Sequence, residues 1–336
     1  PQEPKPPFPY RTEDVEIETE MGHTLAGTLT LPDPNAFEPP YATGILITGS
    51  GPQDRDETIL GHKPFAVLAD HLARRGIASL RCDDRGFGES TGDFASATTL
   101  DFVDDAAAQV AFLTGRDGVG SIGLIGHSEG GLIAPFVAKD SSDVNWLVLL
   151  AGTGVPGREV IIEQSAAIQR ASGADEALVL EQKAAMEALY NATLADDMVQ
   201  AGVSMRRLIT VQMRMNGVEP NEQMTETMTA QQMRGLTEQP WLRTFLELDP
   251  RPALREVTQP VLVLNGELDL QVLPDQNVPE IEKAMEHNSD VEVRVLPGLN
   301  HLFQPAETGS PSEYATIEIT FDPGALEIVS GWVRRR

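Results

Sequence analysis

Residues 121–131 place a serine at the turn between a short apolar strand and a helix, and this stretch limits the possible folds more than any other. It reads Ser-Ile-Gly-Leu-Ile-Gly-His-Ser-Glu-Gly-Gly, so that Gly126 and Gly130 flank Ser128 in the pattern G-x-S-x-G. A side chain at either flanking position would clash with the adjoining strand or helix in so sharp a turn. The helix that follows, predicted over residues 129–138, directs its N-terminal N–H groups toward the serine and stabilises negative charge there. Ser128 is therefore the candidate nucleophile.

The rest of the chain predicts an α/β fold with a mostly parallel central sheet flanked by helices. Apolar runs without alternation, typical of strands buried on both faces, occupy residues 44–48, 77–80, 146–151 and 260–266. A further strand is predicted at 291–296, and helices at 64–75, 98–114, 281–287 and 323–335. Residues 14–20 and 24–31 alternate apolar and polar side chains, which predicts an antiparallel β-hairpin ahead of the sheet.

A helical insertion interrupts the strand–helix pattern. Residues 158–255 are rich in Ala, Glu, Gln, Leu and Met, contain eight of the ten methionines and show no strand. An insertion here lies above the carboxyl edge of the sheet, where ligands bind in open α/β sheets, so we interpret it as a cap. Its methionines either line a pocket for varied acyl groups or pack the core of the cap itself. The expected domains are an arm and hairpin (1–43), a catalytic domain (44–157 with 256–336) and the cap.

An acid and a base follow the serine along the chain. Asp269 and His301 each come just beyond a predicted strand, so both are expected to meet Ser128 at one edge of the sheet. A serine hydroxyl becomes a good nucleophile when a base takes its proton, and a carboxylate orients that base and stabilises the imidazolium. Glu267 is the rival acid.

The other five histidines are weaker candidates for the base. His127 adjoins the serine and is expected to point away from it, and His287 is expected inside a helix. The remaining three, His23, His62 and His71, precede the serine motif. No spacing of histidines and carboxylates indicates a metal site, so neither a metal nor a cofactor is expected.

The composition excludes several classes of partner. The 336 residues carry a net charge of -26, which disfavours nucleic acid and anionic membrane surfaces. No run of 18 apolar residues predicts a transmembrane helix. The single cysteine, Cys82, excludes an internal disulfide. The chain begins at Pro1 with a Pro-rich arm, from which we expect an exported bacterial protein, periplasmic or secreted, with a cytoplasmic one as the alternative.

The motifs together resemble the bacterial serine esterases of the α/β-hydrolase superfamily, and more narrowly the EstD-like carboxylesterases. The residues that carry this resemblance are Gly126–Gly130, Gly49–Asp56, Asp83–Ser90, Asp269 and Asn300–His301. The order nucleophile, acid, base is also the order of that superfamily. The resemblance implies the α/β-hydrolase fold and hydrolysis of short-chain carboxylic esters through an acyl-enzyme, with a small-molecule ester as the partner.

Other activities of the same fold stay open at this point. Acyl thioesterases and peptidases or amidases are related branches, although the chain has no room for a β-propeller before the hydrolase part. Binding proteins of this fold without catalysis usually lack one triad residue, and none is missing here.

The resemblance also implies an oxyanion hole built from two backbone N–H groups. One comes from Glu129, the residue after the nucleophile, and the other from the loop after the strand at 44–48. In that loop Ser50 is the first choice and Gly51 the second, because Pro52 has no N–H. The Glu129 side chain is expected either to order the oxyanion loop or to meet an amine of the substrate.

One charged run offers a second interpretation. Asp83, Asp84 and Arg85 form either an active-site cluster or an ion pair that pins a tight loop near the strand ends, and we favour the ion pair.

Overall fold

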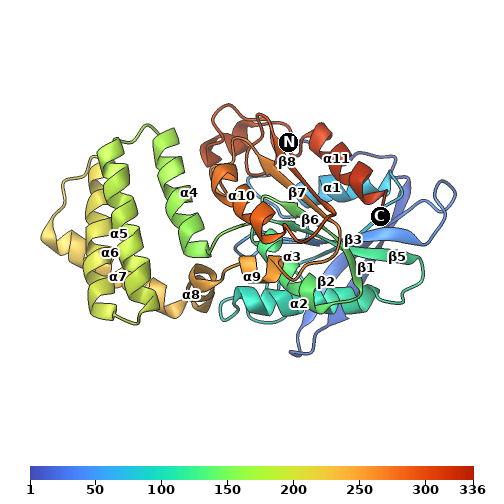
Figure 1. Ribbon diagram of the computed structural model, residues 1–336, viewed down its shortest axis with the longest axis horizontal. Helices are drawn as coiled ribbons and strands as arrows, with labels where there is room; N and C mark the ends of the chain where they lie inside the picture. Colours follow the sequence, from blue (N-terminus) through green and yellow to red (C-terminus); the bar gives the residue numbers. More distant parts are fainter.

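A computed structural model describes residues 1–236 and 238–336 with their side chains, and the backbone throughout. One eight-stranded sheet runs through the larger part of the molecule, in the order β1-β2-β4-β3-β5-β6-β7-β8 (Figure 1). From β4 to β8 every neighbouring pair is parallel, whereas β1 with β2 and β2 with β4 are antiparallel. The strands are β1 (Tyr10–Glu18), β2 (Thr24–Pro32), β3 (Tyr41–Ile47), β4 (Ala78–Cys82), β5 (Val119–His127), β6 (Val144–Leu150), β7 (Val261–Gly266) and β8 (Val291–Leu296).

Helices cover both faces of this sheet, as its doubly apolar strands require. Buried side chains of α2 and α3 pack on one face, together with those of α10, and α1 and α11 pack on the other. Their bounds are α1 (Pro64–Ala73), α2 (Thr99–Leu113), α3 (Glu129–Asp140), α10 (Pro274–Ala284) and α11 (Pro323–Val333). The predicted fold class, with an N-terminal hairpin, is confirmed, and β1 and β2 form one edge of the central sheet.

The segment between β6 and β7 is helical, as the sequence predicts. It contains α4 (Gly157–Ala171), α5 (Glu176–Leu194), α6 (Met198–Met215), α7 (Glu222–Glu238), α8 (Pro240–Glu247) and α9 (Arg251–Leu254). Helices α4 to α7 stand to one side of the sheet, and α8 and α9 lead back to it (Figure 1). Met186, Met205 and Met213 are buried in a core that this segment forms for itself. The second of the two roles considered for these methionines therefore holds for them.

One predicted helix is shifted. The helix expected over residues 281–287 is α10, which begins at Pro274 and ends at Ala284, so His287 lies beyond its end. The proline at the first position has its φ already set for a helix and needs no intrahelical N–H acceptor, which explains the earlier start.

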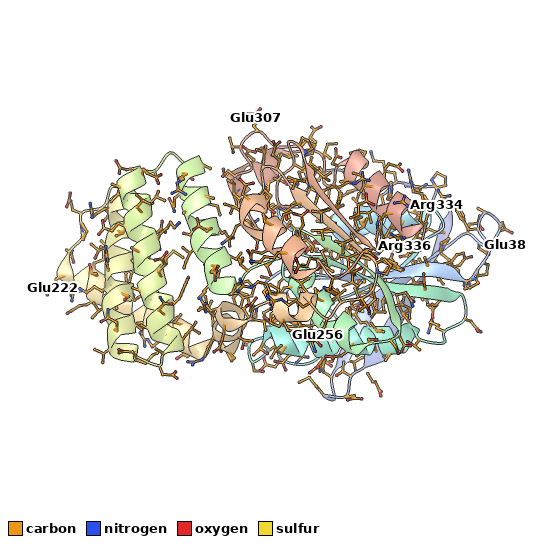
Figure 2. All side chains as sticks on the ribbon, viewed as in Figure 1. Glu38, Glu222, Glu256, Glu307, Arg334 and Arg336 are labelled. Atoms are coloured by element: carbon orange, nitrogen blue, oxygen red, sulfur yellow. The ribbon has the colours of Figure 1, made fainter. Side chains whose placement is uncertain are left out.

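Acidic side chains lie at both ends of the molecule, in keeping with its net charge of -26. Glu222 lies at the outer end of the helical segment and Glu38 at the opposite end of the molecule (Figure 2). No helix in the described part of the chain combines the length and the apolar character that crossing a membrane requires.

His71 makes the stability of the fold depend on pH. Its Nε2 lies 2.9 Å from Ser330 Oγ, across the contact between α1 and α11. Burial, with a smaller contribution from the Arg75 charge, lowers the pKa of His71 to about 4 from its ordinary 6.5. Between these values the unfolded chain binds a proton that the folded chain does not, so stability is lost as the pH falls. We expect the melting temperature to drop between pH 6.5 and 4 less steeply in His71→Gln than in the wild type, and an equal drop in thermal melts of both proteins would contradict this.

Candidate active site

A cavity of about 320 Å³ lies at the carboxyl edge of the parallel strands. Ser128 follows β5, Gly49 and Ser50 follow β3, and His301 lies in the loop after β8, and all four residues line the cavity. The ends of three strands that are far apart in sequence thus place a hydroxyl, an imidazole and a backbone loop around the same cavity.

The turn that carries Ser128 has the strained backbone that its glycines predict. Ser128 adopts φ 55° and ψ -115°, a conformation rare for a residue with a side chain. A Cβ on Gly126 would meet the carbonyl oxygen of Gly130, and a Cβ on Gly130 would meet that of Ile47. Strand β5, helix α3 and strand β3 therefore approach so closely that only glycine fits beside the serine.

His301 is bound to a fully engaged carboxylate. Its Nδ1 lies 2.9 Å from Asp269 Oδ2. The other oxygen of Asp269 accepts the backbone N–H groups of Gln271 and Val272 at 2.8 and 2.9 Å. Asp269 is 1% exposed, so this pair is held away from water. The rival acid Glu267 instead accepts the N–H of Gly298 on the exposed side of the loop.

Ser128 and His301 share the cavity without a hydrogen bond between them among the described side chains. Such contacts are often long in an empty site and shorten when a substrate binds. The backbone N–H groups of Ser50 and Glu129 donate to no described protein acceptor, so both are available to an oxygen in the cavity. Ser50 lines the cavity and Gly51 is not among the lining residues.

His127 differs from its prediction, because its ring lies in the site. Its Nδ1 is 2.8 Å from Glu57 Oε1 and its Nε2 is 2.9 Å from the carbonyl oxygen of His301. A carbonyl can only accept, so Nε2 donates, and a carboxylate on the other side makes Nδ1 a donor as well. Burial alone would lower the pKa of His127, but the charge and hydrogen bond of Glu57 raise it above its ordinary value. With both nitrogens donating, His127 has no lone pair with which to act as a base.

Two carboxylates, the buried Glu57 and the half-buried Asp84, hold the loop after β3. Glu57 Oε1 also accepts the N–H of Gly49 at 2.8 Å. Asp84 accepts the Thr48 hydroxyl with one oxygen and the Gln53 N–H with the other, both at 2.8 Å, and so joins the two ends of the loop. Burial raises the pKa of Asp84 to about 7, although these donors favour its charged form. This segment, residues 48–53, is thus tied down around Ser50.

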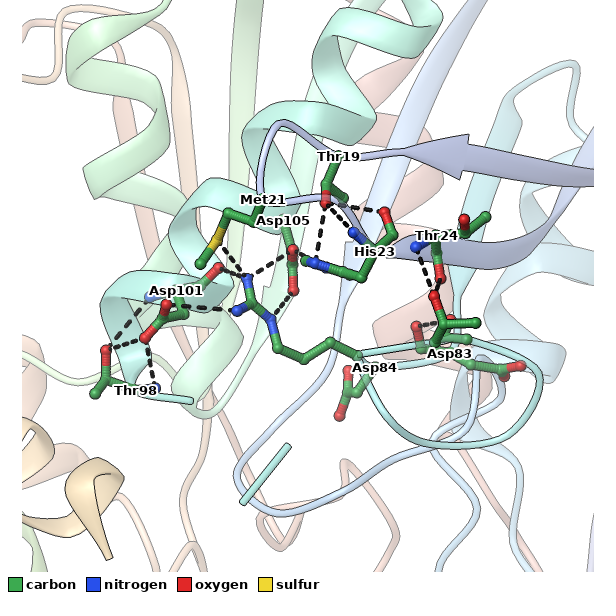
Figure 3. A network of polar contacts seen from close by, with 12 residues as sticks. Thr19, Met21, His23, Thr24, Asp83, Asp84, Thr98, Asp101 and Asp105 are labelled. Atoms are coloured by element: carbon green, nitrogen blue, oxygen red, sulfur yellow. Dashed lines mark hydrogen bonds and ion pairs between the residues drawn. The ribbon is translucent and has the colours of Figure 1, made fainter. Parts of the chain in front are cut away.

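In the charged run after β4, Asp83 and Arg85 form ion pairs with residues of other segments and not with each other. Asp83 pairs with Arg55 at 2.7 Å. Arg85 pairs with Asp105 of α2 at 2.6 Å, and Asp105 also receives His23 Nε2 at 2.8 Å (Figure 3). The run therefore fastens three segments to one another, which agrees with a structural role and corrects the expectation of a single pinned loop.

The side chain of Glu129 is engaged by donors rather than free. Its Oε1 accepts the Thr99 hydroxyl at 2.7 Å and the Trp241 indole N–H at 2.8 Å. The pKa of Glu129 is raised above its ordinary value because burial outweighs the opposite effect of these two donors and of Ser50. The side chain thus also contacts Ser50 in the loop after β3, which supports the first of its two expected roles, the ordering of that loop.

Most of the remaining lining is apolar. These residues come from the loops and from the helical segment: Ile59, Val160, Ile161, Trp241, Phe245, Val272 and Leu302. Of the residues that the structure describes with side chains, no lysine, arginine or methionine lines the cavity. In the described part of the chain no three His, Cys, Asp or Glu side chains gather in a way that could hold a metal ion.

A family model described as serine aminopeptidase, S33 matches residues 63–307, which contain the serine turn, Asp269 and His301. The chain belongs to this family. The S33 match leaves out the hairpin of β1 and β2 and the loop after β3, both of which precede residue 63.

The chain is also similar to two esterases, one by sequence and one by structure. It is 26% identical to esterase EstD of Thermotoga maritima over 295 residues, or 86% of this chain and 61% of EstD. The predicted resemblance is confirmed, although the chain spans less than two thirds of EstD. Among solved structures, the esterase Pf2001 of Pyrococcus furiosus has a TM-score of 0.58 at 16% identity, covering 98% and 91% of the two chains. The proline iminopeptidase of Mycobacterium smegmatis has a TM-score of 0.56 at 17% identity, covering 96% and 98%. These two likenesses confirm the α/β-hydrolase fold.

Two residues around the cavity had no signal in the sequence, and a third had a signal that did not show its partners. Glu57 meets His127 from 70 positions away, and Trp241 meets Glu129 from 112 positions away. Asp84 belongs to a charged run that is visible in the sequence, but its partners on the loop after β3 are not. Only the folded chain brings such distant residues together.

Proposed function

We propose that the chain is a serine carboxylesterase that hydrolyses short-chain carboxylic esters through an acyl-enzyme on Ser128. The observation that carries the proposal is the shared cavity, which holds Ser128 on its strained turn together with His301 on the buried Asp269 carboxylate. The similarity to EstD supports ester chemistry for this site.

In the proposed reaction, His301 Nε2 removes the proton of Ser128 as Oγ attacks the ester carbonyl. Asp269 keeps the imidazole in the tautomer that leaves Nε2 free and stabilises the imidazolium. The N–H groups of Glu129 and Ser50 hold the oxyanion, each contributing about 3 kcal/mol to lowering the barrier. His301 then protonates the leaving alcohol, and water releases the acid by the same route.

Neither alternative reaction finds a suitable binding group among the lining residues. An acyl-CoA thioester carries phosphates, yet no lysine or arginine lines the cavity. An aminopeptidase needs an acid for the substrate amine, and the family description makes this the second candidate. The two acids that line the cavity are already engaged, Glu57 by His127 and Glu129 by Thr99 and Trp241.

The domain boundaries belong to the proposal. We place a cap at residues 158–255 over a catalytic domain of residues 44–157 and 256–336, with the arm and hairpin at 1–43. Side chains of α4 and α8 line the cavity, which supports the cap. An exported protein stays a prediction.

A panel of p-nitrophenyl esters from acetate to palmitate tests the function. We expect high kcat/KM for the short esters and a decline with chain length, because the cavity is small. Aminoacyl p-nitroanilides, run beside them, are expected to react far more slowly. A folded protein that cleaved the anilides and none of the esters would favour the aminopeptidase.

A further inference from the structure

Trp241 is the point where the helical segment contacts the residue next to the nucleophile. It lies in the first turn of α8, and its indole N–H donates to Glu129 Oε1 at 2.8 Å. Other polar links between this segment and the sheet side, such as Gln164 to Gln271 and Gln276 to the Glu159 carbonyl, involve no residue of the serine turn. Trp241 thus ties α8 directly to the start of α3.

The acceptor of this hydrogen bond is itself fixed. Glu129 is 2% exposed, and the Thr99 hydroxyl donates to the same oxygen from the start of α2 at 2.7 Å. Movement of Trp241 away from Glu129 would remove one of the two donors to this buried oxygen, which costs free energy because little water is there to replace the lost hydrogen bond.

Trp241 and Phe245 form one wall of the cavity. Their rings stack with centroids 5.1 Å apart and an interplanar angle of 19°, and both line the cavity. Phe245 packs closely against the start of α4. A Cβ added to Gly157 would collide with the Phe245 carbonyl oxygen, so the two helices leave no space between them at this point. The two rings therefore cannot move away from the cavity without breaking either this packing or the hydrogen bond between Trp241 and Glu129.

We infer that Trp241 is a specificity-determining residue that limits the length of the acyl chain, and that Glu129 is the positioning residue that holds it there. The inference rests on the proposed ester hydrolysis of the same site. It assigns to the Glu129 side chain a function separate from that of its backbone N–H: the N–H donates to the oxyanion, and the carboxylate sets the boundary of the acyl pocket.

Ester panels on three variants test the wall. The ratio of kcat/KM for p-nitrophenyl octanoate to that for the acetate is expected to rise about tenfold or more in Trp241→Ala, since one methylene in an apolar pocket is already worth about tenfold. Trp241→Phe keeps a ring but loses the donor, and a smaller rise is expected. Tyr190→Phe is the matched control, because it removes a hydroxyl from a buried ring of the same segment that does not line the cavity. A ratio in Trp241→Ala equal to that of the wild type would overturn the inference.

Tryptophan fluorescence tests the link to Glu129 without relying on activity. The chain has three tryptophans, and Trp146 and Trp332 are 0% and 1% exposed, so acrylamide quenching reports mainly on Trp241. We expect Glu129→Ala to increase quenching, with Trp241→Phe giving the background of the other two rings. Unchanged quenching in Glu129→Ala would overturn the positioning role, whereas a wild type that hydrolysed no ester would overturn the proposed function instead.

Discussion

Ser128→Ala is expected to lower kcat for p-nitrophenyl acetate roughly 10⁶-fold, the loss seen when the nucleophile of a comparable triad is removed. Alanine keeps the Cβ and the turn but removes the Oγ that would form the acyl-enzyme. The residual rate would come from the oxyanion N–H groups and from substrate binding, neither of which needs the hydroxyl.

Steady-state kinetics on purified protein measure this loss, and a circular dichroism melt shows whether the variant is folded. Ser141→Ala is the control, because Ser141 lies at the other end of α3 and its hydroxyl accepts the N–H of nearby Asp143. It is expected to retain the wild-type kcat. A folded Ser128→Ala with more than a small fraction of the wild-type kcat would exclude the acyl-enzyme on this residue.

Features encoded by neighbouring residues could be predicted from the sequence. The strand, the glycines and the helix around Ser128 follow one another directly along the chain, and the structure shows β5, the strained turn and α3 where the sequence predicts them. The hairpin of β1 and β2 is likewise defined by alternation and a short turn. Local patterns were sufficient here because each element is stabilised by the same side chains that reveal it.

The supporting residues of the site could not be predicted, because their partners are distant in sequence. Nothing near Glu57 indicates that His127 will contact it, and this contact makes His127 part of the site rather than a neighbour that only follows the strand. The ion pairs of Asp83 and Arg85 likewise reach other segments. The charges of Asp83 and Arg85 predict that each forms an ion pair, but the packing of the loops decides with which residue.

The residues of the helical segment that line the cavity could not be predicted from composition. Methionine content drew attention to this segment, yet the residues at the cavity are Trp241 and Phe245 on α8. Composition describes a whole segment, whereas a pocket is lined by the few side chains that face it. Which face of α8 points inward depends on the bond to Glu129 and on the contact with Gly157.

The second large effect is expected at the carboxylate. Asp269→Asn should lower kcat about 10⁴-fold, as an asparagine in this role of a serine triad stabilises the wrong tautomer of the base. The Asp269 carboxylate accepts His301 Nδ1–H, which leaves Nε2 unprotonated toward Ser128. An asparagine that turned its amide N–H₂ toward Nδ1 would place the proton on Nε2, and the oxygen on the other side would still accept the N–H groups of Gln271 and Val272.

Glu267→Gln is the matched control for this change, because it makes the same substitution on the rival acid two residues earlier. Glu267 accepts the Gly298 N–H at 2.9 Å on the exposed side of the loop, and a glutamine can keep that bond through its carbonyl. We therefore expect near wild-type kcat for Glu267→Gln and wild-type folding for both variants. The reverse result, a large loss in Glu267→Gln and little in Asp269→Asn, would assign the acid to Glu267. It would also mean that the loop after β7 rearranges during the reaction, since Asp269 is the carboxylate that contacts His301 in the structure.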